Sequence, residues 1–564
     1  MAFSSIIAGE EYYRVAIGQG MYTSELPSNI PDGFSAMAYN MVATGDSLEN
    51  RIGIKRPSVN WNVFEVAAGT PNSDAEKINI IYPLFPTRVD AAFPAFAWAS
   101  WGSQFPSGAS ANPYKLNFVR CSGTGTGDGF MSVTLPALCL GICQYQDTVY
   151  FTMIGQGVQK ITNFNWTADT ITYTQVASSA GGTFSGLFTF KDRLWAFQDS
   201  NLYFTDVAPV GGLPEQWAFA TNRVAFVGPS GAGRIRKIVP LSNKLLVFTM
   251  GGLFTLVVEG PPASWILKLL DSRSISTTNQ CAFESKGIIY YINTVGVWAT
   301  NGVYVTKVSG VIEDLFFLAV GSRTHSIVPY EDGMIISVAK IAEVDHASHN
   351  SAQCRIFYSK LDPIAWTEWN IQSKSPASSV MESRRICCIY STSDKIVTFL
   401  NPQPVVYSLM YISNSTEAQP DWAVLQLLVF DGGKDQIMSE LGTVLTAPVN
   451  IYLKTKQMDG GNPYNIKMNK RGLLEMFTSD ALHRVTTSWQ IDATTSDGGS
   501  VRKTLTQDQT VGIGSNLIQI PAGFHYRRCG LILSADLQTD NSQIKIKDIA
   551  IVQNTERGEF ELTR

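Results

Sequence analysis

The chain has 564 residues, with 46 glycines, 11% aromatic residues and only 16% charged residues. The formal net charge of −4 is nearly neutral for this length, which argues against a nucleic-acid-binding protein of the basic kind. No apolar run approaches the ~18 residues that a membrane-spanning helix needs, so we expect no membrane span. The many glycines and aromatics indicate an all-β protein, long enough for more than one domain.

Residues 1–76 predict an extended N-terminal arm, because glycine and proline recur through them and interrupt any long element. Within the arm, the segment 40–57 reads NMVATGDSLENRIGIKRP. Two segments of the whole chain look helical, TGDSLENR (44–51) and LLEMFTSDALHR (473–484).

Residues 77–430 repeat one pattern, which is clearest in LFTFKDRLWAFQDSNLYFTDV (187–207). Three runs in which apolar and polar residues alternate are separated by polar turns at 191–193 and 198–201. This alternation predicts strands rather than helices, and the whole unit reads as an antiparallel meander. A meander this short cannot bury its own apolar faces, so it needs neighbours of the same kind.

Copies of the meander pattern return along the chain. They lie at 146–162, 242–260, 285–302, 331–340 and 383–401, with a degenerate copy at 91–121. The first turns of the regular copies are marked by Asp147, Asp192, Asn243, Lys286, Asp332 and Arg384. Successive markers are about 43 to 52 residues apart, close to the period of propeller blades. The sequence therefore predicts a β-propeller of about six or seven blades.

The repeat stops at residues 431–433, and 431–564 read as separate short strands. We expect a C-terminal β-sandwich or jelly-roll domain there. In QIKIKDIAIV (543–552) the alternation is interrupted once, which predicts a register shift at Asp548. With that shift the isoleucines point inward: Ile544, Ile546, Ile549 and Ile551.

Several segments carry residues that could form a site, and none matches a complete motif. GPSGAGRI (228–235) resembles a phosphate-binding loop, but Arg234 replaces the lysine and Ile235 stands where a hydroxyl should ligate magnesium. His346 and His349 could share a metal, yet they fall in a polar insertion that reads as a solvated loop. Glu313 and Asp314 suggest no paired acid and base.

Cysteines and tryptophans lie mostly inside apolar runs. We expect the cysteines to be buried, reduced thiols: Cys121, Cys139, Cys143, Cys281, Cys354, Cys387, Cys388 and Cys529. Six tryptophans could line a sugar-binding surface, but packing between blades is the interpretation we prefer: Trp98, Trp101, Trp195, Trp298, Trp366 and Trp369. We therefore expect no catalytic residue, no cofactor and no metal.

Three stretches resemble one protein family. The arm segment 40–57, in which an asparagine leads to R-x-G…RP, is similar to the opening of virion proteins of short-tailed bacteriophages. The hairpins at 187–207 and 236–257 (RKIVPLSNKLLVFTMGGLFTLV) resemble a pair of hairpins in phage tail nozzle proteins, also called tail tubular protein B. AWTEWN (365–370) resembles the W-x-x-W strand near the end of such propellers.

The resemblance implies a structural virion protein, not an enzyme, that is assembled in the host bacterial cytoplasm into the virion tail. Its subunits would form a ring, six-fold in the family, below the portal and adaptor. The ring would continue the channel through which genomic DNA passes without specific binding, and it would anchor tail fibres, spikes or a needle. The alternatives are a propeller glycosidase, lyase or polysaccharide depolymerase, and a monomeric WD40-type scaffold, although the Gly-His…Trp-Asp signature of the latter is missing.

Overall fold

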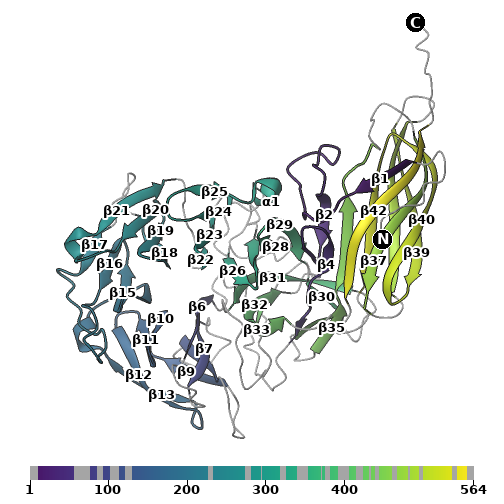
Figure 1. Ribbon diagram of the computed structural model, residues 1–564. Coiled ribbons are helices and arrows are strands. Elements are labelled where there is room, and N and C mark those ends of the chain that lie inside the picture. The colour runs from purple at the N-terminus through teal and green to yellow at the C-terminus, as the bar shows by residue number, and fades with distance from the viewer. Residues whose placement is uncertain are drawn as a thin grey trace.

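Figure 1 shows a computed structural model of the chain. It describes residues 11–55, 77–85, 93–101, 114–120, 130–225, 233–272, 281–293, 295–317, 326–339, 354–369, 371–374, 381–391, 406–413, 423–430, 434–438, 444–459, 467–479, 483–494, 500–536 and 543–555.

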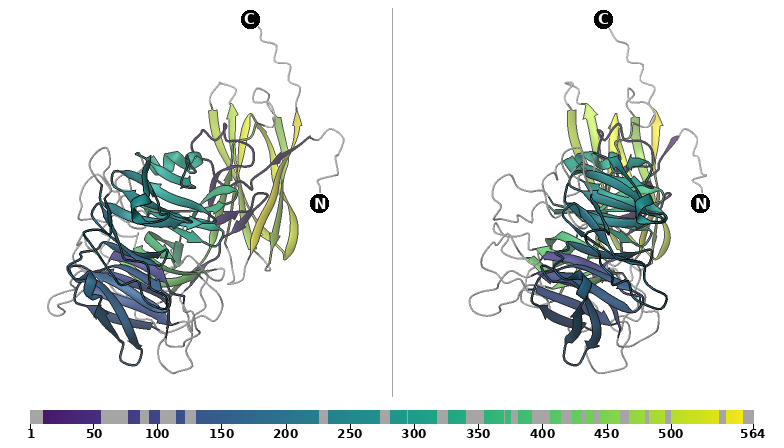
Figure 2. Two further views of the ribbon diagram at one scale, coloured as in Figure 1. Left: turned by 60° about the vertical axis from the view of Figure 1, so that its left-hand side comes forward. Right: turned by 90° about the vertical axis from the view of Figure 1, so that its left-hand side faces the viewer.

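Seven groups of four antiparallel strands follow one another through the described part of 77–430 (Figures 1 and 2). They are β6 (Lys77–Pro83), β7 (Pro94–Trp101), β8 (Tyr114–Arg120), β9 (Phe130–Leu135); β10 (Cys139–Tyr145), β11 (Thr148–Met153), β12 (Gly157–Asn165), β13 (Thr170–Gln175); β14 (Gly186–Phe190), β15 (Arg193–Gln198), β16 (Asn201–Phe204), β17 (Arg223–Ala225); β18 (Ile235–Leu241), β19 (Lys244–Thr249), β20 (Gly252–Val257), β21 (Ile266–Asp271); β22 (Ala282–Ser285), β23 (Ile288–Asn293), β24 (Gly296–Thr300), β25 (Val305–Lys307); β26 (Ser326–Tyr330), β27 (Gly333–Ala339), β28 (Cys354–Leu361), β29 (Ile364–Trp369); and β30 (Ile371–Lys374), β31 (Met381–Ser391), β32 (Tyr407–Ser413), β33 (Ala423–Phe430).

These groups are the blades of a β-propeller, which confirms the predicted fold class. First strands of neighbouring blades contact one another, as β10 does with β6 and β14, and β22 with β18 and β26. The apolar cores lie between consecutive blades, where aromatic and aliphatic side chains from two sheets interdigitate. A single meander buries neither face alone, and its neighbours supply the missing surface.

The first hairpin turn of the second to sixth blades explains why the repeat is visible in the sequence. In the third and fifth blades both central residues have positive φ: Lys191 (49°) with Asp192 (54°), and Lys286 (51°) with Gly287 (79°). Two-residue turns of this kind match the twist of the flanking strands, and they favour Gly, Asn and Asp. A two-residue turn between two apolar runs therefore marks the second to sixth blades, at 146–147, 191–192, 242–243, 286–287 and 331–332. The turn predicted at Arg384 is wrong, because Arg384 lies inside β31.

The C-terminal residues form a β-sandwich, one of the two predicted alternatives. One sheet has the strand order β3-β4-β42-β37-β40, in which β3 (Met41–Ala43) and β4 (Leu48–Asn50) come from the arm. The opposing layer has the order β36-β41-β38-β39. The strands are β36 (Asn450–Thr455), β37 (Lys467–Thr478), β38 (His483–Thr494), β39 (Ser500–Val511), β40 (Gly514–Tyr526), β41 (Arg528–Asp536) and β42 (Ile544–Thr555). A two-stranded sheet of β34 (Lys434–Met438) and β35 (Val444–Pro448) precedes them.

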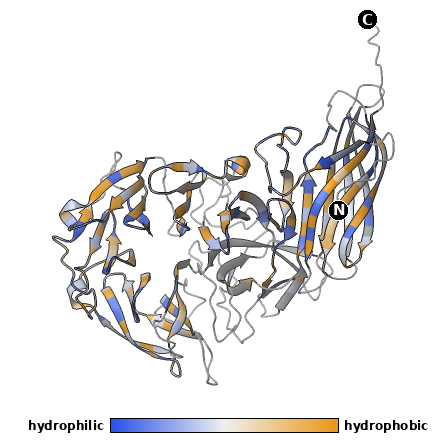
Figure 3. Ribbon diagram, in the orientation of Figure 1, coloured by the Kyte–Doolittle hydropathy of each residue, from blue (hydrophilic) through white to orange (hydrophobic). Residues whose placement is uncertain are grey.

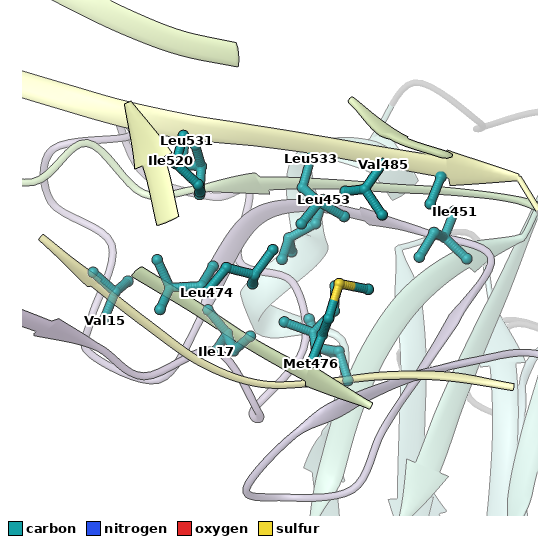
Figure 4. Close-up of a cluster of buried hydrophobic side chains, with 14 of the residues drawn as sticks. Val15, Ile17, Ile451, Leu453, Leu474, Met476, Val485, Ile520, Leu531 and Leu533 are labelled. Carbon is teal, nitrogen blue, oxygen red and sulfur yellow. The ribbon is translucent and has the colours of Figure 1, made fainter. Parts of the chain in front are cut away.

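Polar and apolar residues alternate along the sandwich strands (Figure 3), and the apolar ones meet in one core (Figure 4). The predicted register shift in β42 is confirmed: Glu475 pairs with Asp548, but the next residue, Met476, pairs with Ile546. All four isoleucines named for the inner face are fully buried: Ile544, Ile546, Ile549 and Ile551.

Residues 11–55 of the N-terminal arm are extended, as predicted, and their strands are parts of three larger sheets: β1 (Glu11–Val15), β2 (Ser35–Tyr39), β3 (Met41–Ala43), β4 (Leu48–Asn50) and β5 (Ile54–Lys55). β1 and β4 pair with β42 of the sandwich, and β5 pairs with β33 of the last blade. β2 lies between β29 of the sixth blade and β36 of the sandwich. Blade and sandwich layer thereby become one nine-stranded sheet.

The prediction of helices at 44–51 and 473–484 is wrong. The first segment contains strand β4, and the second contains the end of β37 and the start of β38. Adjacent leucines in the second segment imitate a helical pattern, but Leu474 packs in the sandwich core while Leu473 packs on the other face, beside Tyr12 of the arm. The described helices are α1 (Glu313–Phe317) and three short 3-10 turns, at Ala177–Ser179, Pro262–Ser264 and Gly310–Ile312.

Candidate functional site: the joint between propeller and sandwich

A buried ion pair lies where the arm, the end of the propeller and the start of the sandwich meet. The Arg51 guanidinium donates from Nη1 to Asp435 Oδ1 at 2.8 Å and from Nη2 to Asp435 Oδ2 at 2.5 Å. Arg51 comes from the arm, whereas Asp435 lies in β34, directly after the propeller. The side chains are 0% and 1% exposed. We call this pair and its hydrogen-bond partners the joint.

The remaining polar groups around the pair are satisfied, as a buried ion pair requires. Arg51 Nε donates to Asn40 Oδ1 at 2.9 Å, and Arg51 Nη1 also donates to the Ile52 carbonyl at 3.1 Å. The Ile54 amide donates to Asp435 Oδ1 at 3.2 Å. A bidentate pair with these additional bonds is geometrically specific, so it fixes where the arm lies on β34.

Two backbone features explain why the arm sequence has an asparagine and a glycine around this arginine. Asn40 has a φ of 56°, a left-handed conformation that asparagine tolerates better than most residues. At Gly53 a Cβ atom would lie 2.2 Å from the Lys434 carbonyl oxygen, so no side chain fits there. The Asn…R-x-G pattern of the arm is therefore the sequence of the joint itself.

The same arm segment is bound to the sixth blade and to the sandwich. Asn40 donates from Nδ2 to the Asn450 carbonyl at 2.7 Å, and its amide donates to the Glu368 carbonyl at 2.7 Å. The Met41 carbonyl accepts the Trp369 indole N–H at 3.0 Å. The arm, the sixth blade and the sandwich, which are far apart in the sequence, therefore meet at Asn40 and Met41.

Glu368 is a nearly buried carboxylate beside the joint. Its side chain is 7% exposed, and Oε1 lies 3.4 Å from Nε of Arg355, which is 37% exposed. Glu368 also forms the parallel pair with Tyr39 through which β2 joins the sixth blade. Burial raises the pKa of Glu368 to about 7, against a smaller lowering by Arg355. The Tyr39 pKa is raised to about 12, first by burial and then by Glu368.

Because of Glu368, the protein is expected to become less stable as the pH rises. Below its ordinary pKa of 4.5 the carboxyl is protonated in both the folded and the unfolded chain, and no difference arises. Between pH 4.5 and about 7 the folded chain keeps a proton that the unfolded chain has lost. The free energy of unfolding therefore decreases through this window, by about 3 kcal/mol, and stays at the lower value above it.

Glu368→Gln is expected to remove this dependence of the free energy of unfolding on pH, as measured by urea unfolding from pH 4 to pH 8. The variant should also be more stable than the wild type at pH 8. Glu25→Gln, at an exposed arm residue, is the control. A variant with the same slope as the wild type would contradict the assignment of this titration to Glu368.

The sites considered in the sequence are only partly covered by the described residues. His346, His349 and residues 226–232 lie outside them. Strand β18, not a helix, follows the glycine-rich segment, as predicted from its sequence. Arg234 Nη2 lies 3.2 Å from Asp199 Oδ1, in an exposed ion pair between the third and fourth blades.

The acidic pair Glu313 and Asp314 binds the arm. Ser24 Oγ accepts the Glu313 amide at 3.0 Å, and Thr23 donates its hydroxyl to Asp314. Glu313 also forms an ion pair with Lys307. The Glu313 amide and the Asp314 carboxylate hold the arm against the fifth blade, a role that sequence reasoning missed because the partners are about 290 residues away.

Tryptophans and cysteines pack in the cores, as we preferred. Four of the six tryptophans are buried, namely Trp98, Trp195, Trp366 and Trp369, whereas Trp298 is partly buried and the Trp101 side chain is not described. The four described cysteine side chains are buried thiols: Cys139, Cys143, Cys281 and Cys529. Burial raises the pKa of the Cys139 thiol to about 12, so this thiol is unreactive.

Among the described residues, no three His, Cys, Asp or Glu side chains gather closely enough to hold a metal ion. The described helices include none that is long and apolar enough to cross a membrane.

No protein-family model and no curated protein matches the sequence. Similar solved structures include YCF48 bound to D1 peptide, at 10% identity and a TM-score of 0.32, covering 66% of this chain and 97% of that one. Hsv2 of Kluyveromyces lactis has 8% identity and a TM-score of 0.27, covering 56% and 93%. The computationally designed Ika8 protein has 10% identity and a TM-score of 0.29, covering 68% and 97%. At these values the similarities carry no argument about function.

Proposed function

We propose that this chain is a structural virion protein, the tail nozzle of a short-tailed bacteriophage. Subunits assemble into a ring below the portal and adaptor, the ring continues the channel for DNA, and its outer surface anchors fibres, spikes or a needle. The protein acts mechanically in the virion tail and reaches it after assembly in the bacterial cytoplasm.

The observation that supports this function best is the construction of the joint. Arm residues that resemble the opening of short-tailed phage virion proteins, Asn40, Arg51 and Gly53, are the ones that form it. An arm shared among three sheets resists bending between propeller and sandwich, because relative motion would break strand pairing and a buried ion pair together. A conduit that contains moving DNA needs such a rigid connection.

The charge of the chain fits a passive conduit. With 43 basic and 47 acidic residues, a ring of these subunits has no overall excess of cations to hold phosphates. Each phosphate neutralised by Lys or Arg adds affinity through counterion release, so a strongly basic wall would slow the DNA that it should let pass.

Ring formation is the test of this function. Purified protein, alone and with the adaptor-side tail protein, should form closed rings, six-fold by the family resemblance, in native mass measurement and electron microscopy. The same protein should be found in purified virions. A chain that stays monomeric under both conditions and is absent from virions would overturn the proposal, and release of sugars from a bacterial polysaccharide by that monomer would support the depolymerase alternative.

A further inference from the structure

One loop of the arm connects the fifth blade to the sandwich. It comprises residues 23–32, and backbone hydrogen bonds close its base: the Gln19 amide donates to the Gly33 carbonyl at 2.9 Å, and the Ser35 amide donates to the Gly20 carbonyl at 2.8 Å. In Figure 1 the loop lies between α1 and the sandwich. Compact surface loops whose ends lie close together are frequently functional. We call residues 23–32 the strap.

One end of the strap is bound to the turn that follows the fifth blade and leads into α1. The amides of Thr23 and Ser24 both donate to the Val311 carbonyl, at 2.8 and 3.3 Å. Ser24 Oγ donates to the Gly310 carbonyl at 2.7 Å and accepts the Glu313 amide at 3.0 Å. The arm therefore supplies a hydroxyl that caps the start of α1 from 289 residues away.

The other end of the strap is bound to the sandwich. The Gln457 amide donates to the Pro27 carbonyl at 2.9 Å. Lys456, directly after β36, forms an ion pair with Asp32, and its Nζ lies 3.5 Å from the Ile30 carbonyl oxygen. Water has access to this ion pair, because the Asp32 side chain is 82% exposed. The strap thus joins the fifth blade to the sandwich separately from the joint.

The strap is held less firmly than the joint. Ile30 is the one buried residue between 23 and 32, and the other side chains of the strap are half-buried or exposed. The Arg51–Asp435 pair, by contrast, is fully buried, and the arm strands around it belong to three sheets. Segments with few buried apolar contacts and solvent-exposed hydrogen bonds open at the lowest cost in free energy. The strap should therefore open while the joint stays closed.

We propose that the strap opens as a unit, so that release of one end loosens the other end while the joint remains closed. Each bound end holds the loop near the partner of the other end, which raises the effective concentration of the second contact. Pro27 and Pro31 restrict the backbone between the two ends. An end that is already bound therefore removes part of the conformational entropy that binding of the other end would cost. Such coupling is reciprocal, so it must be measurable from either end.

Amide hydrogen exchange resolved to single residues tests the proposal, because each end has a reporter: the Thr23 amide at the fifth blade and the Gln457 amide at the sandwich. Ser24→Ala removes two hydrogen bonds at the first end and should speed exchange at Gln457, the far end, by about fivefold. Lys456→Met removes the ion pair at the second end and should speed exchange at Thr23 by about two- to fivefold. The Ile54 amide, which reports on the joint, should exchange at the wild-type rate in both variants.

Ser28→Ala and Lys454→Met are the matched controls. Ser28 lies in the strap but binds neither partner, since its hydroxyl donates to Asn29 Oδ1 at 3.1 Å. Lys454 is the preceding lysine of the same chain segment, in β36, and makes none of the strap's hydrogen bonds. Both controls should leave exchange at Thr23 and Gln457 at the wild-type rate.

Two results would overturn the proposal. Faster exchange confined to the end that carries the substitution would mean that the two ends open independently. Exchange at Ile54 that rises in step with the strap would mean that the strap and the joint open together. None of these outcomes depends on ring formation, so they leave the proposed function to its own test.

Discussion

Asp435→Ala is expected to lower the free energy of unfolding by about 3–5 kcal/mol, because it leaves the Arg51 guanidinium buried without a counter-charge. The Ile54 amide loses its acceptor at the same time. Urea unfolding at constant pH measures the loss. Hydrogen exchange should also show that residues 48–55 become less protected, since the joint holds this segment on β34.

Replacing both partners tests whether the loss comes from the unpaired charge. Arg51→Met combined with Asp435→Leu removes both charges, and the double variant should be more stable than Asp435→Ala alone, because neither partner leaves an isolated ion. The matched control is Arg234→Ala, which breaks the exposed pair with Asp199 and should cost less than about 1 kcal/mol. Equal costs for Asp435→Ala and Arg234→Ala would mean that the joint contributes no more than a surface ion pair.

The propeller could be predicted from the sequence because each blade is local. Strands β14, β15 and β16 follow one another within residues 186–204, and their turns are short enough to leave a visible repeat. The bulge of β42 was predictable for the same reason, since a break in alternation at Asp548 is a feature of one segment.

The joint could not be predicted, because its partners are far apart in the chain. Arg51 and Asp435 are separated by 384 residues, and nothing near either residue indicates the other. Residues 40–57 could be recognised only by resemblance, and that resemblance did not state what the asparagine, arginine and glycine do. The role of β2 as the strand between blade and sandwich was hidden in the same way.

The W-x-x-W motif at 366–369 has one property that its spacing predicts and one contact that depends on a distant part of the chain. Residues three apart on a strand point to opposite faces, so the spacing alone places one tryptophan on each side of the blade. Trp366 packs in the core shared with the fifth blade, and Trp369 packs on the other face, 4.7 Å from the ring of Tyr358. The hydrogen bond from Trp369 to the arm, by contrast, depends on a residue 328 positions away.

Trp369→Ala and Trp366→Ala are both expected to reduce the free energy of unfolding by about 3–5 kcal/mol, because each opens a cavity in a buried core. Their local effects should differ. Trp369→Ala removes the indole N–H that donates to the Met41 carbonyl. It also removes the indole ring, whose centroid lies 5.9 Å from Cζ of the Arg51 guanidinium. Hydrogen exchange at residues 41–50 should therefore rise in this variant.

Trp366 donates instead to the Val308 carbonyl of the fifth blade, at 3.0 Å. Trp366→Ala should leave exchange at 41–50 near the wild-type level and raise it around 305–312. Trp369→Phe keeps a ring against Tyr358 but loses the bond to Met41, so its cost should be nearer 1 kcal/mol. Equal increases in hydrogen exchange at residues 41–50 in the two alanine variants would mean that the arm depends on the stability of the sixth blade as a whole. That result would refute a specific role of Trp369 at the joint.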